Sequence, residues 1–228
     1  MPRHARLPLW DDKSPDQKIE ALRDQLLDLY RCQMGGALAE IVAQLDAHQP
    51  ADAKEARDMR QIKALIAEHP NIMSMHCEVG HITASAVIVH PDTGRTLLHW
   101  HKRLNRWLQV GGHVEYETDI AQTALREARE ETGLPDLAHF PLGAAPRPID
   151  YDVHTIPEVD GFPEHLHLDF RYVLVTQAPA ALAPAEGESA RLRWLGFAEA
   201  LSLGDAIDDS LRRLLRKAAA LFGFETDR

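Results

Sequence analysis

The stretch that decides the fold is Gly111–Leu134, which reads GGHVEYETDIAQTALREAREETGL. Its second half carries three carboxylates, Glu127, Glu130 and Glu131, at the spacing i, i+3 and i+4. On a helix this spacing puts all three on one side, where each like-charged pair is unfavourable by about 0.2–0.5 kcal/mol. A charged face that meets only solvent is the ordinary explanation of such a pattern. The neighbouring residues therefore decide whether these carboxylates do more.

Those neighbours form a glycine-bounded loop followed by a capped helix. Gly111 and Gly112 precede the loop, the Thr118 hydroxyl is a candidate N-terminal cap, and Gly133 ends a helix predicted over 119–132. Mg²⁺ binds a few carboxylate oxygens and keeps its other positions for water and substrate phosphate. The loop and helix together therefore suit a hard divalent cation.

The segment Gly112–Leu134 resembles the Nudix box, Gly-x5-Glu-x7-Arg-Glu-U-x-Glu-Glu-x-Gly-U, in which U is a bulky aliphatic residue. Seven of the nine specified positions match, namely Gly112, Arg126, Glu127, Glu130, Glu131, Gly133 and Leu134. Thr118 stands where the first glutamate is expected, and Ala128 replaces a larger aliphatic residue. Glu117 lies one residue before the missing glutamate and is a partial substitute that points in another direction.

The resemblance implies a role for each matching residue. Glu127 and Glu131 are the expected principal ligands of Mg²⁺, with Mn²⁺ as the alternative ion, and Glu130 lies close behind them. The backbone carbonyl of Gly111 is expected to supply a further oxygen. Arg126 is expected to hold the glutamates in place, and the lost supporting carboxylate at residue 118 bears on metal stoichiometry and rate.

A second acid outside the box is expected from the resemblance. Glu188, six residues before Trp194, lies at a suitable offset, and its neighbour Glu186 is the alternative. Either glutamate is a candidate metal ligand or general base, and Glu131 is the third candidate for the base. A solvated loop glutamate explains Glu188 equally well.

Polar residues elsewhere are candidates for substrate binding. His165, His167 and Asp169 alternate along a predicted strand, so they point to one face. We rank a substrate cleft first for this face, a polar outer face second, and zinc third, because no third nitrogen or sulfur ligand is evident. Arg103 lies in the basic loop that leads into the glycine turn. It is a candidate phosphate contact, with ordinary surface charge as the alternative.

The coarse order of elements predicts an α+β fold, an α/β/α sandwich of Nudix type with an N-terminal helical extension. Residues 1–70 form the extension, with helices expected over 14–35, 37–47 and 51–68, and a capping box over 14–17. Residues 71–228 form the catalytic domain. Its strands are predicted over 81–90, 95–101, 108–111, 149–153, 165–176 and 191–194, and its last helix over 205–222. The extension is expected to pack on the catalytic domain or to form a homodimer interface.

Composition excludes several classes. The chain has 228 residues and a net charge of −10, without the basic stripe of a protein that binds a nucleic-acid duplex. Its longest apolar run, 82–89, is too short to span a membrane, and residues 1–10 do not resemble a secretion signal. Two cysteines, Cys32 and Cys77, form no disulfide framework. We therefore expect a cytoplasmic protein.

The resemblance predicts a Mg²⁺-dependent hydrolase that cleaves a diphosphate linkage in a nucleoside diphosphate derivative or a related small phosphorylated compound. The alternative is a catalytically weak or inactive Nudix domain that binds a nucleotide as a sensor, which the loss of a glutamate at Thr118 favours. Pro148 and Tyr151 follow Leu134 by 14 and 17 residues. In some Nudix subgroups a proline or tyrosine about fifteen residues after the box indicates the substrate. Neither Pro148 nor Tyr151 lies at that offset, so the sequence does not identify the substrate.

Overall fold

The computed structural model describes residues 14–115, 117–141, 143–158, 163–185 and 191–226, with the backbone alone for residues 21 and 23–34. By its internal contacts the chain divides into two units, Met1–Ile41 and Val42–Arg228. The predicted boundary at residue 70 stays a prediction. Helix α2 lies within the second unit, where it packs against a strand of the sheet.

Most of the described first unit is a single helix, α1 (Pro15–Ala47), which continues into the second unit. The predicted capping box is confirmed, because Ser14 N donates to Gln17 Oε1 at 3.0 Å and Gln17 N to Ser14 Oγ at 3.3 Å. The predicted break at Gly35 and Gly36 is wrong, since both residues are helical. A glycine inside a helix costs about 1 kcal/mol, which weakens a helix without ending it.

The second unit contains a mixed sheet and further helices. The helices are α2 (Ala53–Glu68), α3 (Ile120–Thr132), α4 (Phe197–Leu201) and α5 (Asp209–Phe222), with short turns η1 (Pro91–Thr93) and η2 (Gly204–Ala206). The strands are β1 (Gly80–His90), β2 (Arg95–His101), β3 (Arg106–Leu108), β4 (Val110–His113), β5 (Ala138–His139), β6 (Asp150–Ile156), β7 (His165–Val175) and β8 (Leu192–Gly196). The long strands and α3 are confirmed within a few residues, whereas β5 and α4 were not predicted.

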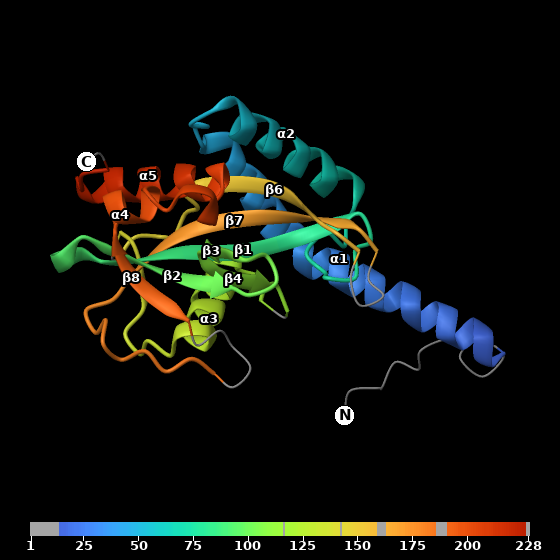
Figure 1. Ribbon diagram of the computed structural model, residues 1–228. Coiled ribbons are helices and arrows are strands. Elements are labelled where there is room, and N and C mark those ends of the chain that lie inside the picture. The colour runs from blue at the N-terminus through green and yellow to red at the C-terminus, as the bar shows by residue number, and fades with distance from the viewer. Residues whose placement is uncertain (1–13, 116, 142, 159–162, 186–190, 227–228) are drawn as a thin grey trace. The chain divides into compact units, whose positions relative to one another are not determined.

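The sheet has β1 and β7 at its centre, paired in parallel from Gly80↔Leu166 to Val89↔Val175. The other pairings are antiparallel: β2 and β4 pair with β1, β5 and β6 pair with β7, and β3 and β8 pair with β2. Helix α3 covers one face of the sheet, and α2 and α5 lie on the other (Figure 1). The predicted α/β/α sandwich is confirmed.

The face of β1 and β7 that α5 covers changes character along the strands, and we call it the banded face. It carries imidazoles first, then polar and charged groups, then valines. In that order its residues are His81, His165 and His167; Thr83, Ser85, Asp169 and Arg171; and Val87, Val89, Val173 and Val175. The valines join the apolar core beneath α5. Both strands are almost entirely buried, as expected for parallel strands covered on both faces.

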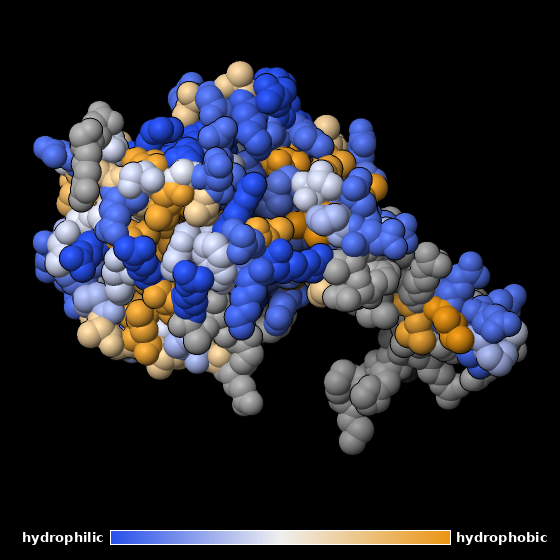
Figure 2. Space-filling model, in the orientation of Figure 1, coloured by the Kyte–Doolittle hydropathy of each residue, from blue (hydrophilic) through white to orange (hydrophobic). Residues whose placement is uncertain are grey.

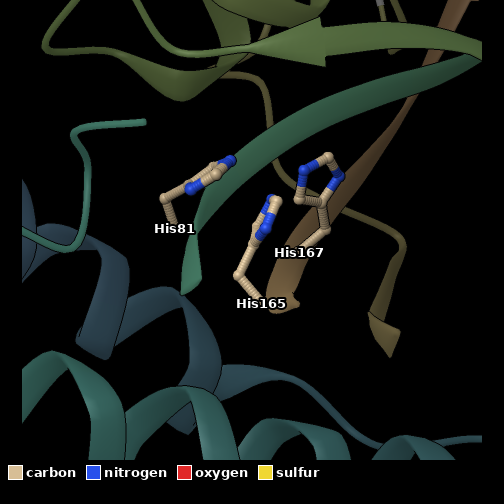
Figure 3. Close-up of side chains that lie close together, drawn as sticks. All are labelled: His81, His165 and His167. Atoms are coloured by element: carbon tan, nitrogen blue, oxygen red, sulfur yellow. The ribbon is translucent and has the colours of Figure 1, made fainter. Parts of the chain in front are cut away.

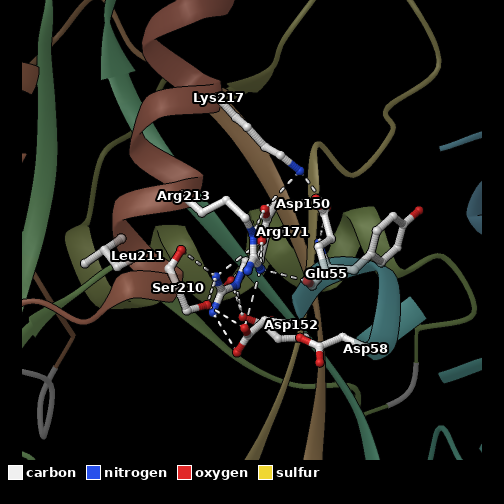
Figure 4. A network of polar contacts seen from close by, with 12 residues as sticks. Glu55, Asp58, Asp150, Asp152, Arg171, Ser210, Leu211, Arg213 and Lys217 are labelled. Carbon is white, nitrogen blue, oxygen red and sulfur yellow. Dashed lines mark hydrogen bonds and ion pairs between the residues drawn. The ribbon is translucent and has the colours of Figure 1, made fainter. Parts of the chain in front are cut away.

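A buried charged network fastens α2 and α5 to the sheet (Figure 4). From α5, Arg213 donates to both carboxylate oxygens of Asp150 at 2.7 and 2.9 Å and to the carbonyl of Tyr151 at 2.9 Å. Arg171 of β7 donates to Ser210 Oγ at 2.6 Å and lies 3.1 Å from Asp152. Removing one partner from such a network leaves a buried charge, which is strongly destabilising.

Helix α2 joins the same network through Glu55, which is fully buried. Lys217 of α5 lies 2.5 Å from its carboxylate, and the backbone N–H of Tyr151 donates to it at 3.2 Å. Burial acts to raise the pKa of Glu55, but hydrogen bonds from His48 and Lys217 outweigh it and lower the pKa to about 2. The docking of α2 therefore depends on charge as well as on apolar contact.

The visible surface mixes hydrophilic and apolar residues, and hydrophilic side chains separate the apolar ones into several patches (Figure 2). Within the part of the chain that the structure describes, no helix is long and apolar enough to cross a membrane.

Candidate active site

Two glycines at β4 bring the backbone close to α3. Gly111 has φ +153° and pairs with Ser85, and a side chain there would run into the backbone of β1. Gly112 faces Glu127, whose carboxylate fills the space that a Cβ would need. The N–H of Gly111 donates to Glu131 Oε1 at 2.7 Å. The glycines therefore allow two carboxylates of α3 to approach the sheet backbone.

Both ends of α3 are capped, one of them by a different residue from the one predicted. The N-cap is Asp119, whose Oδ1 accepts from Ala121 N at 3.0 Å, while Thr118 is exposed. The expectation of a Thr118 cap was therefore wrong by one residue. Gly133 ends the helix in the left-handed conformation at φ 68°, and its N–H donates to Arg129 O at 2.7 Å, as predicted.

The three carboxylates of α3 differ in their surroundings. Glu131 is buried, and its Oε2 lies 3.0 Å from His99 Nδ1 on β2. The Glu130 side chain is half-exposed, at 49 %. Glu127 is largely covered, and burial, reinforced by the neighbouring Glu130 and Glu131 charges, raises its pKa to about 7 against the opposing effect of Arg126.

Arg126 holds this cluster together, as the resemblance implied. Its Nη1 donates to both Glu127 Oε1 and Glu130 Oε2 at 3.0 Å, and its Nη2 donates to the carbonyl of His113 at 2.8 Å. Its Nε donates to Glu117 Oε1 at 2.5 Å. Burial acts against the charged form of Glu117, but this hydrogen bond, backbone hydrogen bonds and the charge of Arg126 together lower the pKa. Glu117 thus supports the arginine, although it does not occupy position 118.

This donor set fits a hard divalent cation. Glu127, Glu130 and Glu131 come from little more than one helical turn, and the charge of Arg126 is already shared with Glu117. Burial, with the neighbouring Glu130 and Glu131 charges, raises the pKa of Glu127, so its charged form is unfavourable without a cation. Carboxylate oxygens beside a backbone turn are the ligands that Mg²⁺ and Mn²⁺ favour.

A pocket of about 660 Å³ lies at the ends of β2 and β4, and its described lining includes none of the three α3 carboxylates. Its lining includes the predicted Arg103, His165 and His167, together with His101 and His113. Two strands link it to α3. On β4, His113 lines the pocket and its backbone carbonyl accepts a hydrogen bond from Arg126. On β2, His101 lines the pocket and lies two residues after His99, which contacts Glu131. The pocket and the carboxylate cluster therefore share the strands β2 and β4.

The remaining predicted residues lie elsewhere. Asp169 shares a strand face with His165 and His167, as predicted, but it lies outside the pocket. Its carboxylate accepts from Ser85 Oγ at 2.7 Å and from Arg171 Nε at 3.0 Å. Asp169 therefore belongs to the polar and charged part of the banded face. Glu186 and Glu188 lie outside the described residues.

Comparison with known proteins places the chain in a family. The NUDIX domain model matches residues 80–217, more than half of the chain. The chain therefore belongs to the NUDIX domain family.

Solved structures with a similar fold come from several organisms. A NUDIX-family hydrolase from Clostridium perfringens is 28 % identical, covering 62 % of this chain and 97 % of that one, with a TM-score of 0.48. An Ap4A hydrolase from C. elegans is 21 % identical over 62 % and 97 %, with a TM-score of 0.45. The dihydroneopterin triphosphate pyrophosphohydrolase of E. coli is 19 % identical over 60 % and 92 %, also at 0.45. None of the curated proteins matches the chain.

Sequence reasoning missed His81 and His113, and it did not predict the contact between His99 and Glu131. His99 contacts Glu131, and His81 and His113 lie beside His165 and His167 with ring centroids 4.8–5.0 Å apart. The strand patterns that contain His81 and His99 were recognised. Only the pairing of distant strands, which local patterns do not specify, brings these side chains to the site.

Proposed function

We propose that this NUDIX protein is a Mg²⁺-dependent hydrolase that cleaves a diphosphate linkage in a nucleoside diphosphate derivative or a related small phosphorylated compound. The observation that carries the proposal is the contact between β4 and α3. There the glycine turn meets Glu127 and Glu131 directly, and Arg126 links Glu127 to Glu130.

We assign the metal ligands to Glu127, Glu130 and Glu131, with the backbone carbonyl of Gly111. When bound, divalent cations would supply charge neutralisation at the diphosphate and a more acidic water. Mn²⁺ is the alternative ion, because it accepts the same oxygen ligands. Arg126 acts as a positioning residue, since its hydrogen bonds to described residues go to the carboxylates and to the backbone of β4.

We assign the substrate to the pocket that Arg103, His165 and His167 line. Arg103 is exposed at its edge, where a guanidinium can pair with a phosphate oxygen. His165 and His167 offer imidazoles to the group beyond the phosphates. The base that takes the proton from the attacking water is proposed to be a carboxylate, with Glu131, Glu188 and Glu186 as the candidates.

A substrate screen with two variants tests the proposal. Purified protein is incubated with Mg²⁺ and nucleotide sugars, ADP-ribose, dinucleoside polyphosphates or nucleoside triphosphates, and product release is measured. Glu131→Gln should abolish the release, because it removes a charged ligand and changes little else in shape. Glu68→Gln, an exposed glutamate on α2, should leave it unchanged. Release that persists in Glu131→Gln would refute the assignment.

The sensor alternative rests on Thr118, which is exposed and contributes no carboxylate. In that case a nucleotide should bind in isothermal calorimetry while no product appears at any Mg²⁺ or Mn²⁺ concentration. Product that requires the cation decides for the enzyme.

A further inference from the structure

Three imidazoles converge at the pocket end of the banded face. His81 of β1 is paired in register with His167 of β7, and His165 lies two residues earlier on the same face of β7. One ring nitrogen from each histidine lies within 4.8 Å of those of the other two. The three rings project into one space (Figure 3). We call these residues the histidine triad.

His81 is the most unusual member of the triad. Its side chain is only 3 % exposed, yet neither ring nitrogen has a hydrogen-bond partner among the described residues. The backbone of Cys77 lies near the ring without reaching hydrogen-bonding geometry. Buried polar groups are almost always satisfied in native proteins, so an unpaired imidazole here points to a missing partner.

The other two histidines are suitably prepared to bind that partner. His165 Nδ1 lies 2.8 Å from the carbonyl of Pro163, which can only accept, so this nitrogen carries the proton and Nε2 keeps its lone pair. A hydrogen bond of this kind to the distal nitrogen orients metal-binding histidines in general. The ring of His167 is only partly buried, and its centroid lies 4.8 Å from that of His81.

The chemistry of the triad differs from that of α3. Imidazole nitrogens suit zinc and similar transition ions, whereas Mg²⁺ prefers oxygen. Zinc–nitrogen bonds of 2.0–2.1 Å in a tetrahedral site place the nitrogens about 3.4 Å apart, so the rings need to close by about 1.4 Å at most. The His165 and His167 side chains are not fully buried and line the pocket, which leaves room for this movement.

Two simpler explanations of the histidine triad are side-chain packing and a bound water molecule. The rings of His81 and His165 are stacked at 5.0 Å, a contact that apolar residues could also make. Apolar residues would leave no unpaired nitrogen, however. A single water could satisfy one nitrogen of His81, but it would not account for ring nitrogens of two further histidines within 4.8 Å.

We propose that His81, His165 and His167 bind a divalent first-row transition ion, with Zn²⁺ as the best-suited ion, and that its fourth position opens to the pocket. Three protein ligands with one open position is the arrangement in which zinc accepts a water or an anionic ligand. The site is distinct from the α3 carboxylates and does not depend on their activity.

The test measures metal binding by the full chain after treatment with a chelator. Zn²⁺ is titrated in competition with a chromophoric chelator, and Co²⁺ is titrated by its visible absorption, which reports coordination number. We expect one tight site per chain that excess Mg²⁺ does not displace. His165→Gln and His167→Gln should each weaken Zn²⁺ binding at least about tenfold.

Two control variants separate this site from its surroundings. His76→Gln changes an exposed histidine that lines the same pocket but lies outside the triad, and it should bind Zn²⁺ like the parent protein. Glu131→Gln should also bind Zn²⁺ unchanged. Far-UV circular dichroism confirms the fold of each variant, and His165→Gln is the safest because its side chain is not buried. Zn²⁺ binding that survives in His165→Gln and His167→Gln, or that is lost in Glu131→Gln, overturns the proposal.

Discussion

Replacing Glu127 by glutamine should stabilise the metal-free protein while it impairs the site. The carboxylate is crowded by Glu130 and Glu131 in a largely covered position, so its charge is unfavourable without a cation. Glutamine keeps the shape, and its carbonyl oxygen can still accept from Arg126. The substitution therefore removes the unfavourable charge and little else.

The size of the effect follows from the pKa of Glu127. A pKa that rises from 4.5 to about 7 on folding disfavours the charged form by about 3 kcal/mol at a pH above both values. The group keeps some contact with solvent, which screens the charges, so we expect about 1–2 kcal/mol. For a chain of this size that is a rise of about 2–8 °C in Tm.

The dependence on pH gives the sign of the effect. Below pH 4.5 Glu127 is protonated in both the folded and the unfolded chain, so the parent protein and Glu127→Gln should melt together. Between pH 4.5 and 7 the parent loses stability relative to the variant, and above pH 7 the difference is constant. Glu130→Gln is the matched control, and it should change Tm less because its side chain is half-exposed.

Thermal unfolding at pH 5 and pH 8, in a chelating buffer and again with Mg²⁺ in excess of the chelator, measures the difference in Tm between the parent protein and Glu127→Gln. With saturating Mg²⁺ the order should reverse, because the ion stabilises the protein that binds it more tightly. A Glu127→Gln protein that melts below its parent at pH 8 without metal would show that the carboxylate is not under electrostatic strain.

Three further predictions concern the same structure. Gly112→Ala should lower Mg²⁺-dependent activity about 10- to 100-fold with little change in Tm, because a Cβ there displaces only the flexible end of Glu127; unchanged activity would contradict the proposed geometry. Arg213→Met should destabilise the fold by about 3 kcal/mol in urea unfolding, whereas Arg216→Met, exposed on the same helix, should change it by less than about 0.5 kcal/mol. The pKa of Glu55, about 2 instead of 4.5, stabilises the protein fully above pH 4.5, so this contribution should disappear as the pH falls toward 2; acid titration of Glu55→Gln should lack it.

The parts of the fold that could be predicted are those that depend on neighbours in sequence. Helix α3 and its Gly133 cap follow from helical spacing and from the conformational freedom of glycine. The N-cap was misplaced because Thr118 and Asp119 are adjacent residues that both cap well, and only the path of the chain selects Asp119. One strand predicted near residues 108–111 proved to be two, β3 and β4, because each pairs with a different strand.

The parts that escaped prediction depend on contacts between distant segments. His81 and His167 are separated by 86 positions, and their pairing requires β1 and β7 to lie parallel in one register. Asp169 alternates with His165 and His167 and was therefore grouped with them. Asp169 instead accepts hydrogen bonds from Arg171, two residues further along β7, and from Ser85 of the distant strand β1, and it lies outside the pocket.

The banded face also bears on how the two central strands find their alignment during folding. A slip of one residue between β1 and β7 would turn buried side chains to the wrong face, and burial alone opposes it. A slip of two residues preserves the alternation, so burial alone would tolerate it. Here such a slip would place Asp169 opposite His81 or Ser85 instead of Thr83, and Arg171 would move away from Ser85. In the observed register both Thr83 and Ser85 donate to Asp169, so these polar contacts favour it over the slip that burial alone would tolerate.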